Sequence, residues 1–332
     1  MRSPGKNGSD IELPQIGFEA LGPTVHSHEA GSGRRVRFID EGPRSGVPVV
    51  FFGGAGTSVR AFRLLEFARP LRLSLGVRVV SVERNGLGRT SFDPDAGVTE
   101  HAEDVWSLLD HLGIREASLV AISGGGPYAA QVAAARPACV RSMHLACAYS
   151  EPIPGAQLDF DPRQVAADPV AWWTFPPESP VHRVPGFVDS AVEEATHAMF
   201  ARGRDAEPEG LRQAFDLYAR TPLPDLARVT GRAFMYWGSE DTLVPGQHID
   251  RWKRSLQSEG REPKTTVRMY SGEGHDVQYR HWDQILTDVA YLGSKILVTA
   301  NGRTLLADAW QEEGLMASGA RLGLAAWHEP ER

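Results

Sequence analysis

Three side chains that could together carry out nucleophilic catalysis, Ser123, Asp241 and His275, each follow a strand-like run of the sequence. A serine hydroxyl is a weak nucleophile at neutral pH and needs a base within hydrogen-bond reach; histidine suits this role because its ordinary pKa is about 6.5. The histidine in turn needs a carboxylate that fixes its tautomer and stabilises the imidazolium. The sequence therefore predicts a triad in which Ser123 attacks a carbonyl carbon, His275 accepts and returns the proton, and Asp241 orients His275.

The segment around Ser123 is typical of a nucleophile elbow, a sharp turn between a strand and a helix. The apolar run 117–122 ends on Ser123, glycines follow, and an alanine-rich helical stretch covers 128–135. Residues two before and two after the nucleophile must be small because the strand and helix backbones nearly touch there. Here they are Ala121 and Gly125, so Ala121 departs from the usual G-x-S-x-G by one methyl group. The alternative is a glycine-rich turn that binds phosphate or nothing.

Alternating strand-like and helical segments must position these residues. Strands are predicted at 35–40, 47–52, 77–82, 117–122, 140–146, 233–237 and 265–270. Helices are predicted at 58–68, 99–112, 128–135, 247–256 and 279–291. This alternation predicts an α/β fold with a mostly parallel sheet. Active sites of such sheets lie beyond the carboxyl ends of the strands, where Ser123 and the loop starting at Gly53 are expected.

The alternation stops in the segment 151–230, which is rich in proline and large apolar residues. Helices are predicted at 188–202 and 209–220, and we interpret the segment as a helical cap over the sheet, since a linker would be less aromatic. Three of its residues, together with Phe52, are candidates for a substrate pocket: Trp172, Trp173 and Met199. These three could equally form a small core within the cap.

The sequence thus predicts a flexible N-terminal leader at 1–30, a core at 31–150 and 231–292, the cap at 151–230, and a C-terminal extension at 293–332. In the extension, Asn301-Gly302 is a hairpin turn signal, although 305–316 could equally form a helix. The extension could support a homodimer.

Composition excludes several classes of partner. Lys and Arg total 35 and Asp and Glu total 42, giving a net charge of −7, which argues against a nucleic-acid partner. The two cysteines, Cys139 and Cys147, provide neither a disulfide framework nor a cysteine-only zinc site, so a reducing cytoplasm is expected. No apolar run approaches the ~18 residues of a membrane span, and residues 1–10 do not read as a signal peptide. The expected partner is a small-molecule substrate.

Taken in order, six segments make the chain resemble a serine hydrolase of the α/β-hydrolase superfamily over roughly residues 35–291. The segments are Phe52-Gly53-Gly54-Ala55-Gly56, Glu83-Arg84-Asn85-Gly86-Leu87-Gly88-Arg89-Thr90, Leu108-Leu109-Asp110-His111-Leu112-Gly113-Ile114, the Ser123 elbow, Gly238-Ser239-Glu240-Asp241 and Gly274-His275. Each segment alone is a weak signal, but six in the correct order, with the correct spacing and strand context, are a strong one. The resemblance implies a parallel sheet covered by helices, a cap after the sixth strand, and neither a metal nor an organic cofactor.

The resemblance also implies an oxyanion hole made by the backbone N–H groups of Gly54 and Gly124. Phe52 stands where the family often has a histidine in a supporting role, which suggests a more apolar floor near the site. Some family members draw the triad acid from the loop where Glu151 lies, and Glu240 is the neighbour of Asp241. All three acids therefore remain candidates, with Asp241 preferred.

The expected reaction is hydrolysis of a small or medium apolar carboxylic ester, because the cap is aromatic and poor in charge clusters. One alternative is an iminopeptidase-like aminopeptidase or a carbon–carbon bond hydrolase on the same triad; another is a binding protein or receptor that keeps the fold. A peptidase acting on a free amine would need acidic groups in the cap. Glu193, Glu194 and Glu209 are present there, but their spacing predicts solvated helix faces. Three histidines in predicted helices are expected to face solvent: His101, His111 and His281.

Overall fold

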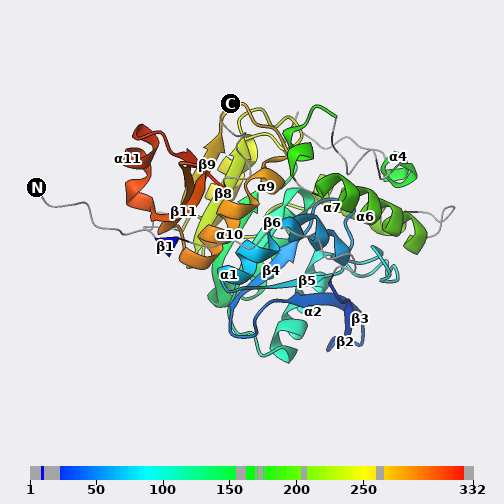
Figure 1. Cartoon of the computed structure of the whole chain (residues 1–332). Coiled ribbons are helices and arrows are strands. Elements are labelled where there is room, and N and C mark those ends of the chain that lie inside the picture. Colours follow the sequence, from blue (N-terminus) through cyan, green and yellow to red (C-terminus); the bar gives the residue numbers. More distant parts are fainter. Residues whose placement is uncertain are drawn as a thin grey trace, which may run out of the picture.

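The computed structural model describes residues 9–10, 23–154, 162–168, 170, 175, 177–184, 186–202, 208–258 and 265–324. Its centre is an eight-stranded sheet with the strand order β2-β3-β5-β4-β6-β7-β8-β9 (Figure 1). The strands are β2 His26–Glu29, β3 Arg35–Glu41, β4 Val47–Phe52, β5 Val77–Val82, β6 Ala117–Ile122, β7 Val140–Ala146, β8 Arg232–Gly238 and β9 Thr265–Tyr270. The pairs β2–β3 and β3–β5 are antiparallel, and all later pairs in this order, from β5–β4 to β8–β9, are parallel. The predicted α/β fold with a mostly parallel sheet is confirmed.

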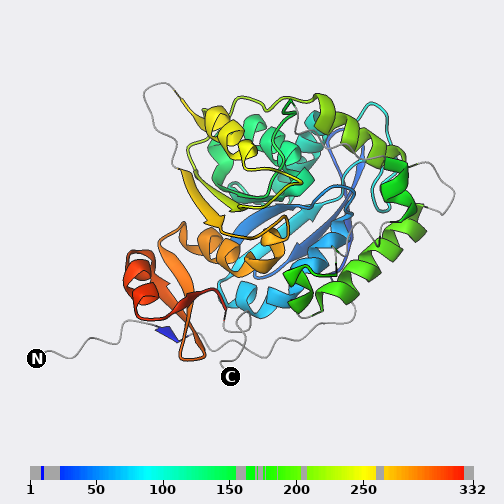
Figure 2. The same cartoon turned by 90° about the horizontal axis from the view of Figure 1, so that it is seen from above.

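The central strands explain why the sequence pattern was readable. All six residues of β5 and all six of β6 are buried. A strand buried on both faces has no solvent-exposed face, so it reads as a mainly apolar run rather than as a regular alternation, even though β5 includes Arg78 and Ser81 and β6 includes Ser118. Figure 2 shows helices on either side of this sheet.

The helices that accompany the sheet largely follow the predicted ranges. They are α1 Arg69–Ser74, α2 Val98–His111, α3 Gly126–Ala135, α8 Gln247–Leu256, α9 Val277–Arg280 and α10 Trp282–Tyr291. Two details differ: Val59–Ala68 forms 3₁₀ turns (η1) that lead into α1, and the last predicted helix is broken at His281 into α9 and α10. Ser58 caps the 3₁₀ segment by accepting a hydrogen bond from the N–H of Arg60.

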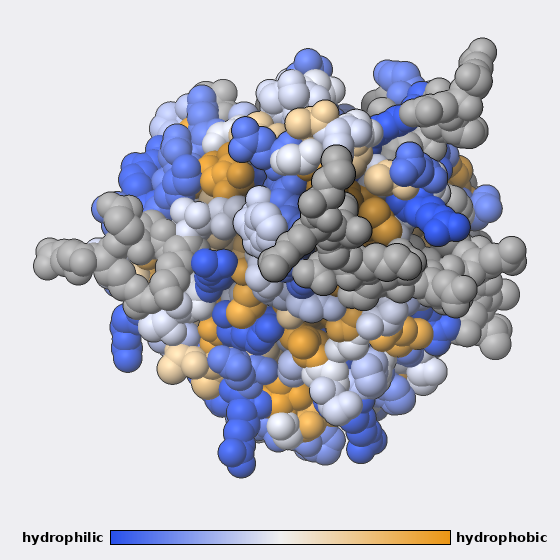
Figure 3. Space-filling view, turned by 60° about the vertical axis from the view of Figure 1, so that its left-hand side comes forward, coloured by the Kyte–Doolittle hydropathy of each residue, from blue (hydrophilic) through white to orange (hydrophobic). Residues whose placement is uncertain are grey.

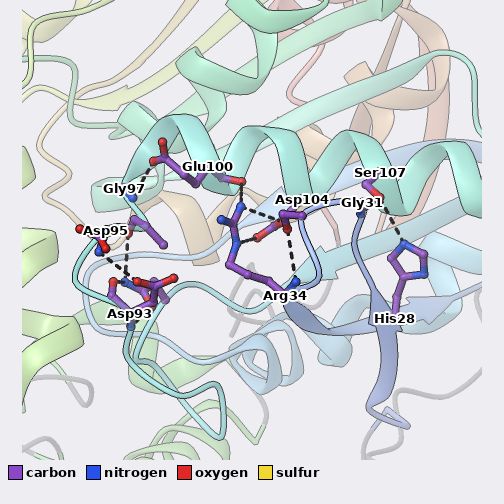
Figure 4. A network of polar contacts seen from close by, with 12 residues as sticks. His28, Gly31, Arg34, Asp93, Asp95, Gly97, Glu100, Asp104 and Ser107 are labelled. Carbon is purple, nitrogen blue, oxygen red and sulfur yellow. Dashed lines mark hydrogen bonds and ion pairs between the residues drawn. The ribbon is translucent and has the colours of Figure 1, made fainter.

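Helix α2 is fixed to the sheet by a polar network (Figure 4). Arg34, just before β3, donates to both carboxylate oxygens of Asp104 at 3.0 Å and to the carbonyl oxygen of Glu100 at 3.0 Å. His101 of the same helix is 5% exposed, so the expectation that it faces solvent is wrong. Its ring lies against Phe52 and Tyr128, and burial, followed by the charges of Arg84 and Arg34, lowers the pKa of His101 to about 3.

Between β7 and β8 the described chain is helical. It contains α4 Pro162–Ala167, a 3₁₀ turn Pro180–Arg183, α6 Phe187–Arg202 and α7 Glu209–Arg220. The green helices α6 and α7 lie along one rim of the molecule in Figure 2, and α6 packs against the 3₁₀ segment Val59–Ala68. The location of this insertion agrees with a cap, while the exact domain limits stay predictions.

The N-terminal prediction needs a correction, because residues 26–29 of the expected flexible leader form β2 and pair with β3. The segment His26-Ser27-His28-Glu29 has no apolar residue and is mostly exposed. It belongs to the sheet through backbone hydrogen bonds at an edge, which a hydrophobic pattern cannot reveal.

The C-terminal segment and β1, from the predicted N-terminal leader, form a second, four-stranded antiparallel sheet in the order β1-β11-β10-β12 (Figure 1). Strands β10 Lys295–Ala300 and β11 Arg303–Asp308 are joined through Asn301-Gly302, so the hairpin forms, and α11 Glu312–Ala317 follows it. The remaining strands are β1 Ser9–Asp10 and β12 Arg321–Leu322. This sheet is anchored to α10, where the carboxylate of Asp283 accepts from the N–H of Leu324 at 2.9 Å.

No helix in the described part of the chain is long and apolar enough to cross a membrane. On the face shown in Figure 3, apolar side chains are scattered among polar ones rather than gathered in one patch.

Candidate active site

The turn after β6 has the geometry of a nucleophile elbow. Ser123 has a φ of 48°, a left-handed conformation that is costly for a residue with a side chain and is found mainly where surrounding structure enforces it. A Cβ at Gly125 would collide with the carbonyl oxygen of Phe52, so the predicted close packing at this glycine is observed. Ala121 is fully buried without disturbing the strand. The carbonyl oxygen of Ser123 also accepts a hydrogen bond of 2.8 Å from the N–H of Tyr149.

The structure brings the three predicted triad side chains together. His275 Nε2 lies 2.9 Å from Ser123 Oγ, and His275 Nδ1 lies 2.8 Å from Asp241 Oδ2. Ser123 follows β6, Asp241 follows β8 and His275 follows β9, so the carboxyl ends of three parallel strands supply the group. This arrangement can transfer the serine proton to the imidazole while the carboxylate holds the opposite ring nitrogen.

The carboxylate of Asp241 is buried but well supplied with donors. Its Oδ1 accepts from the N–H groups of Leu243 at 3.0 Å and Val244 at 2.8 Å. Burial by itself would raise the pKa of Asp241, but the charge and hydrogen bond of His275, the Val244 N–H and the Cys147 thiol outweigh it and hold the pKa below its ordinary value. Asp241 is therefore ionised at neutral pH, as the role of orienting acid requires.

The other two candidate acids have different surroundings. Glu240 is exposed. Glu151 pairs with Arg251 at 3.2 Å and accepts from the N–H of Leu223 at 3.1 Å. Among the described residues, the carboxylate at hydrogen-bond distance from His275 is that of Asp241.

The two glycines predicted for the oxyanion hole flank the nucleophile. A Cβ at Gly54 would lie 4.0 Å from Ser123 Oγ, and Gly124 follows Ser123 directly. The carbonyl oxygen of Gly54 accepts hydrogen bonds from Thr57 Oγ1 at 2.8 Å and from Arg84 at 2.5 Å. The loop beside the nucleophile is thus held by a buried cation.

Sequence reasoning missed three residues of this neighbourhood. Arg84 enters the sequence analysis only within the segment from Glu83 to Thr90, although a charged residue two positions after a buried strand is a usable signal. Cys147 follows β7 with a φ of 45° and donates its thiol to Asp241, while burial and that carboxylate raise the pKa of Cys147. Tyr218, on α7, reaches Gly124, and nothing in its local sequence indicates this.

Of the predicted pocket residues, Phe52 is buried at the end of β4 and lies against His101. Trp172 and Trp173 lie outside the described residues, as does the side chain of Met199. The pocket assignment therefore stays a prediction.

Of the three insertion glutamates expected on solvated helix faces, Glu193 and Glu209 are exposed and Glu194 is not. Glu194 is buried rather than solvated, and its Oε1 accepts a hydrogen bond of 2.5 Å from the hydroxyl of Ser58. Burial raises the pKa of Glu194 to about 7. Its neighbour Glu193 is exposed and pairs with Arg63.

Within the described part of the chain, one group has the spacing of a metal site: Cys147, Asp241 and His275, whose ligand atoms lie within 4.8 Å of one another. His275 and Asp241 already hydrogen-bond each other, and the thiol donates to the same carboxylate. The three side chains therefore form a hydrogen-bonded group around the Asp241 carboxylate.

Comparison with known proteins agrees with the fold. Residues 47–213 match the alpha/beta hydrolase fold family. The dihydrolipoyllysine-residue acetyltransferase component of the acetoin cleaving system of Pseudomonas putida is 27% identical over 286 residues, covering 80% of this chain and 68% of that protein. A putative carbamate hydrolase of Variovorax paradoxus is 28% identical over 214 residues, covering 61% of this chain and 77% of its own.

Solved structures show the same fold. An esterase from a Rhodococcus species superposes with a TM-score of 0.61 at 18% identity, covering 81% of this chain and 98% of that one. A bromoperoxidase from Bacillus anthracis superposes equally well at 19% identity. These two structures carry different names on one architecture, so the likeness speaks for the fold alone.

Proposed function

This chain belongs to the alpha/beta hydrolase family, and on that premise we propose that it is a serine hydrolase that cleaves small or medium apolar carboxylic esters. The observation that carries the proposal is the continuous contact from Ser123 Oγ through His275 to Asp241, at 2.9 and 2.8 Å. The strained backbone of Ser123 supports it, because strain of this kind persists where function demands it.

In the proposed reaction, Ser123 Oγ adds to the ester carbonyl carbon while its proton moves to His275 Nε2. The negative oxygen that forms is stabilised by the N–H groups of Gly54 and Gly124. The bond from the carbonyl carbon to the leaving oxygen then breaks, and His275 gives its proton to that oxygen, which leaves as an alcohol. The acyl group stays on Ser123 Oγ as an acyl-enzyme. Water, deprotonated by His275, attacks the acyl carbon and releases the acid and the free serine. Asp241 holds Nδ1–H throughout and stabilises the imidazolium.

The environment around the site favours an apolar substrate. Phe175 and Phe187 of the insertion pack with tilted rings, their centroids 6.1 Å apart, and both lie against Tyr279, four residues after His275. Leu211 of α7 lies next to Gly56, close to the loop of Gly54. Apolar side chains near a site favour an apolar acyl or alcohol group.

An aminopeptidase on the same triad is less well supported. Recognition of a free amine requires an unpaired carboxylate beside the nucleophile. Glu194 accepts from Ser58 and Glu193 pairs with Arg63, while Glu209 is exposed at the start of α7. A carbon–carbon bond hydrolase and a non-catalytic binding protein on this fold are the competing functions. In the following experiment, labelling of Ser123 by the probe without turnover of any ester or anilide would favour the carbon–carbon bond hydrolase.

The test is a substrate panel of p-nitrophenyl acetate, butyrate and octanoate beside a prolyl p-nitroanilide, with a fluorophosphonate probe for the nucleophile. We expect ester turnover and probe labelling that Ser123→Ala abolishes and that Ser318→Ala, an exposed serine far along the chain, retains. Turnover of the anilide alone would favour the peptidase. An unlabelled wild-type protein with no turnover would favour the binding function.

We also propose a cytoplasmic location, the four-part division of the chain given above, and a homodimer through the C-terminal sheet. Both cysteines are free, which suits a reducing compartment. Sedimentation of the full chain and of a variant lacking residues 293–332 tests the dimer: a full chain that sediments as a monomer excludes it.

A further inference from the structure

The hydroxyl group of Tyr218, on helix α7, fills the space that a side chain at Gly124 would occupy. A Cβ at Gly124 would lie 2.6 Å from Tyr218 Oη and 3.0 Å from the backbone nitrogen of Ala55. Gly124 does not have a left-handed φ, so its backbone conformation does not require glycine. A glycine stands after the nucleophile because a phenol from the insertion approaches there.

This phenol is a buried donor with a free proton. Tyr218 is 1% exposed, and its oxygen accepts a hydrogen bond of 3.4 Å from Arg84 Nη1. No residue in the described ranges accepts the hydroxyl proton of Tyr218. Buried O–H groups normally find an acceptor, and one that lacks a protein partner is available to a ligand. Burial also raises the pKa of Tyr218, against the opposing charge of Arg84, so the proton stays on the oxygen at neutral pH.

The position of Tyr218 is fixed from two sides. Arg84, which contacts its hydroxyl, also donates to the carbonyl oxygen of Gly54 at 2.5 Å and to that of Thr57 at 3.1 Å. Tyr149 donates its own hydroxyl to the carbonyl oxygen of Tyr218 at 3.0 Å, while its backbone N–H donates to Ser123. The phenol is therefore tied to the loop of Gly54 and to the nucleophile turn, the two segments that the substrate carbonyl must meet.

We propose that Tyr218 is a further catalytic residue whose hydroxyl donates a hydrogen bond to the negative oxygen formed when Ser123 adds to the substrate carbonyl. The inference rests on the proposed function. As the Ser123 Oγ–carbon bond forms, the carbonyl π electrons move to oxygen and the serine proton moves to His275. Tyr218 keeps its own proton and shares it with that oxygen, beside the N–H groups of Gly54 and Gly124. When the leaving group departs, the electron pair returns to the carbonyl and the hydrogen bond weakens.

The test is Tyr218→Phe, which removes one oxygen and keeps the buried ring. With p-nitrophenyl butyrate we expect kcat to fall about 10- to 100-fold while KM changes less than about 2-fold, because the donor acts in the transition state. Tyr291→Phe, a partly exposed tyrosine at the end of α10, is the control and should retain wild-type kinetics. Fluorophosphonate titration normalises every rate to the number of competent sites.

A second readout separates catalysis from packing. A trifluoromethyl ketone forms an anionic tetrahedral adduct with a serine nucleophile, so its Ki should rise in Tyr218→Phe by about the factor lost in kcat. A purely structural role would lower the melting temperature and the titratable fraction and leave the normalised kcat unchanged, which would overturn the inference. A wild-type protein that hydrolyses no ester would overturn the proposed function and this inference together. An active wild type with an unaltered Tyr218→Phe would overturn this inference alone.

Discussion

Arg84 donates a hydrogen bond of 2.5 Å to the carbonyl oxygen of Gly54, the glycine whose Cα lies beside Ser123. The nitrogen that donates this bond, Arg84 Nη2, also donates to Thr57 Oγ1 at 2.8 Å. With its carbonyl turned toward Arg84, the Gly54–Ala55 peptide is fixed in one orientation next to the nucleophile. A buried guanidinium thus sets the geometry of the loop that is proposed to hold the oxyanion.

Replacing Arg84 should lower activity, because this side chain holds the loop of Gly54 in place beside the nucleophile. Arg84→Lys keeps the charge, but an ammonium cannot span Gly54, Thr57 and Tyr218 at once. We expect kcat for p-nitrophenyl esters to fall about 10- to 100-fold and the free energy of unfolding to fall by about 1–3 kcal/mol, since buried carbonyl oxygens lose their donors. Arg89→Lys, exposed in the same loop, is the control, and equal effects in both variants would contradict this account.

A methyl group after the nucleophile should be poorly tolerated. In Gly124→Ala the new carbon would lie 2.6 Å from Tyr218 Oη and 3.0 Å from the nitrogen of Ala55, so one of the two groups must move. We expect kcat to fall at least about 10-fold with a melting temperature lowered by only a few degrees. Gly246→Ala is a matched control because a Cβ there meets nothing within 4 Å. If Gly124→Ala had the kinetics of the wild type, the close approach of Tyr218 to Gly124 would not be needed for catalysis.

The fold was largely readable from the sequence because its central strands are buried on both faces. Runs such as Val77–Val82 and Ala117–Ile122 have no solvent-exposed side, are mainly apolar and stand out from their surroundings. The glycine loops after them mark the carboxyl ends, so Ser123, Asp241 and His275 can be placed at one edge of the sheet from the sequence alone.

What escaped prediction depends on contacts between distant segments. Strand His26–Glu29 is polar and is held by backbone pairing alone. His101 lies on the buried face of its helix with Val105 and Leu108, which follow it at helical spacing. Histidine is a polar residue type, so its type alone predicts exposure to solvent, and only this spacing indicates burial. The approach of Tyr218 to Gly124 joins residues that are 94 positions apart in the numbering, so no local pattern could indicate it.

The choice of triad acid can be tested by a paired substitution. Asp241→Asn leaves the size of the side chain unchanged but cannot stabilise the imidazolium and favours the wrong histidine tautomer. We expect kcat to fall about 10³- to 10⁴-fold, with the protein still folded because Leu243 and Val244 can donate to the amide oxygen. Glu240→Gln and Glu151→Gln should each remain within about 3-fold of wild type. A large loss in Glu151→Gln together with a mild one in Asp241→Asn would reassign the acid.

Glu194 should make the attachment of helix α6 dependent on pH. Burial raises the pKa of this carboxyl from its unfolded value of 4.5 to about 7, against the Ser58 hydrogen bonds and the charge of Arg60. The folded state therefore binds the proton more tightly than the unfolded state. The stability from this group is complete below about pH 4.5 and is lost as pH rises to about 7; the loss is at most on the order of 3 kcal/mol.

Glu194→Gln isolates this effect, because an amide can still accept from the Ser58 hydroxyl and carries no titrating proton. Melting temperatures of the variant and the wild type, measured at pH 5, 6, 7 and 8, should show a difference that shifts in favour of the variant as pH rises. Glu193→Gln, the exposed neighbour on the same helix, is the control and should leave the pH slope of the melting temperature unchanged. A constant difference between Glu194→Gln and wild type over this range would show that the carboxyl stays ionised in the folded protein, because an ionised group loses no proton as pH rises.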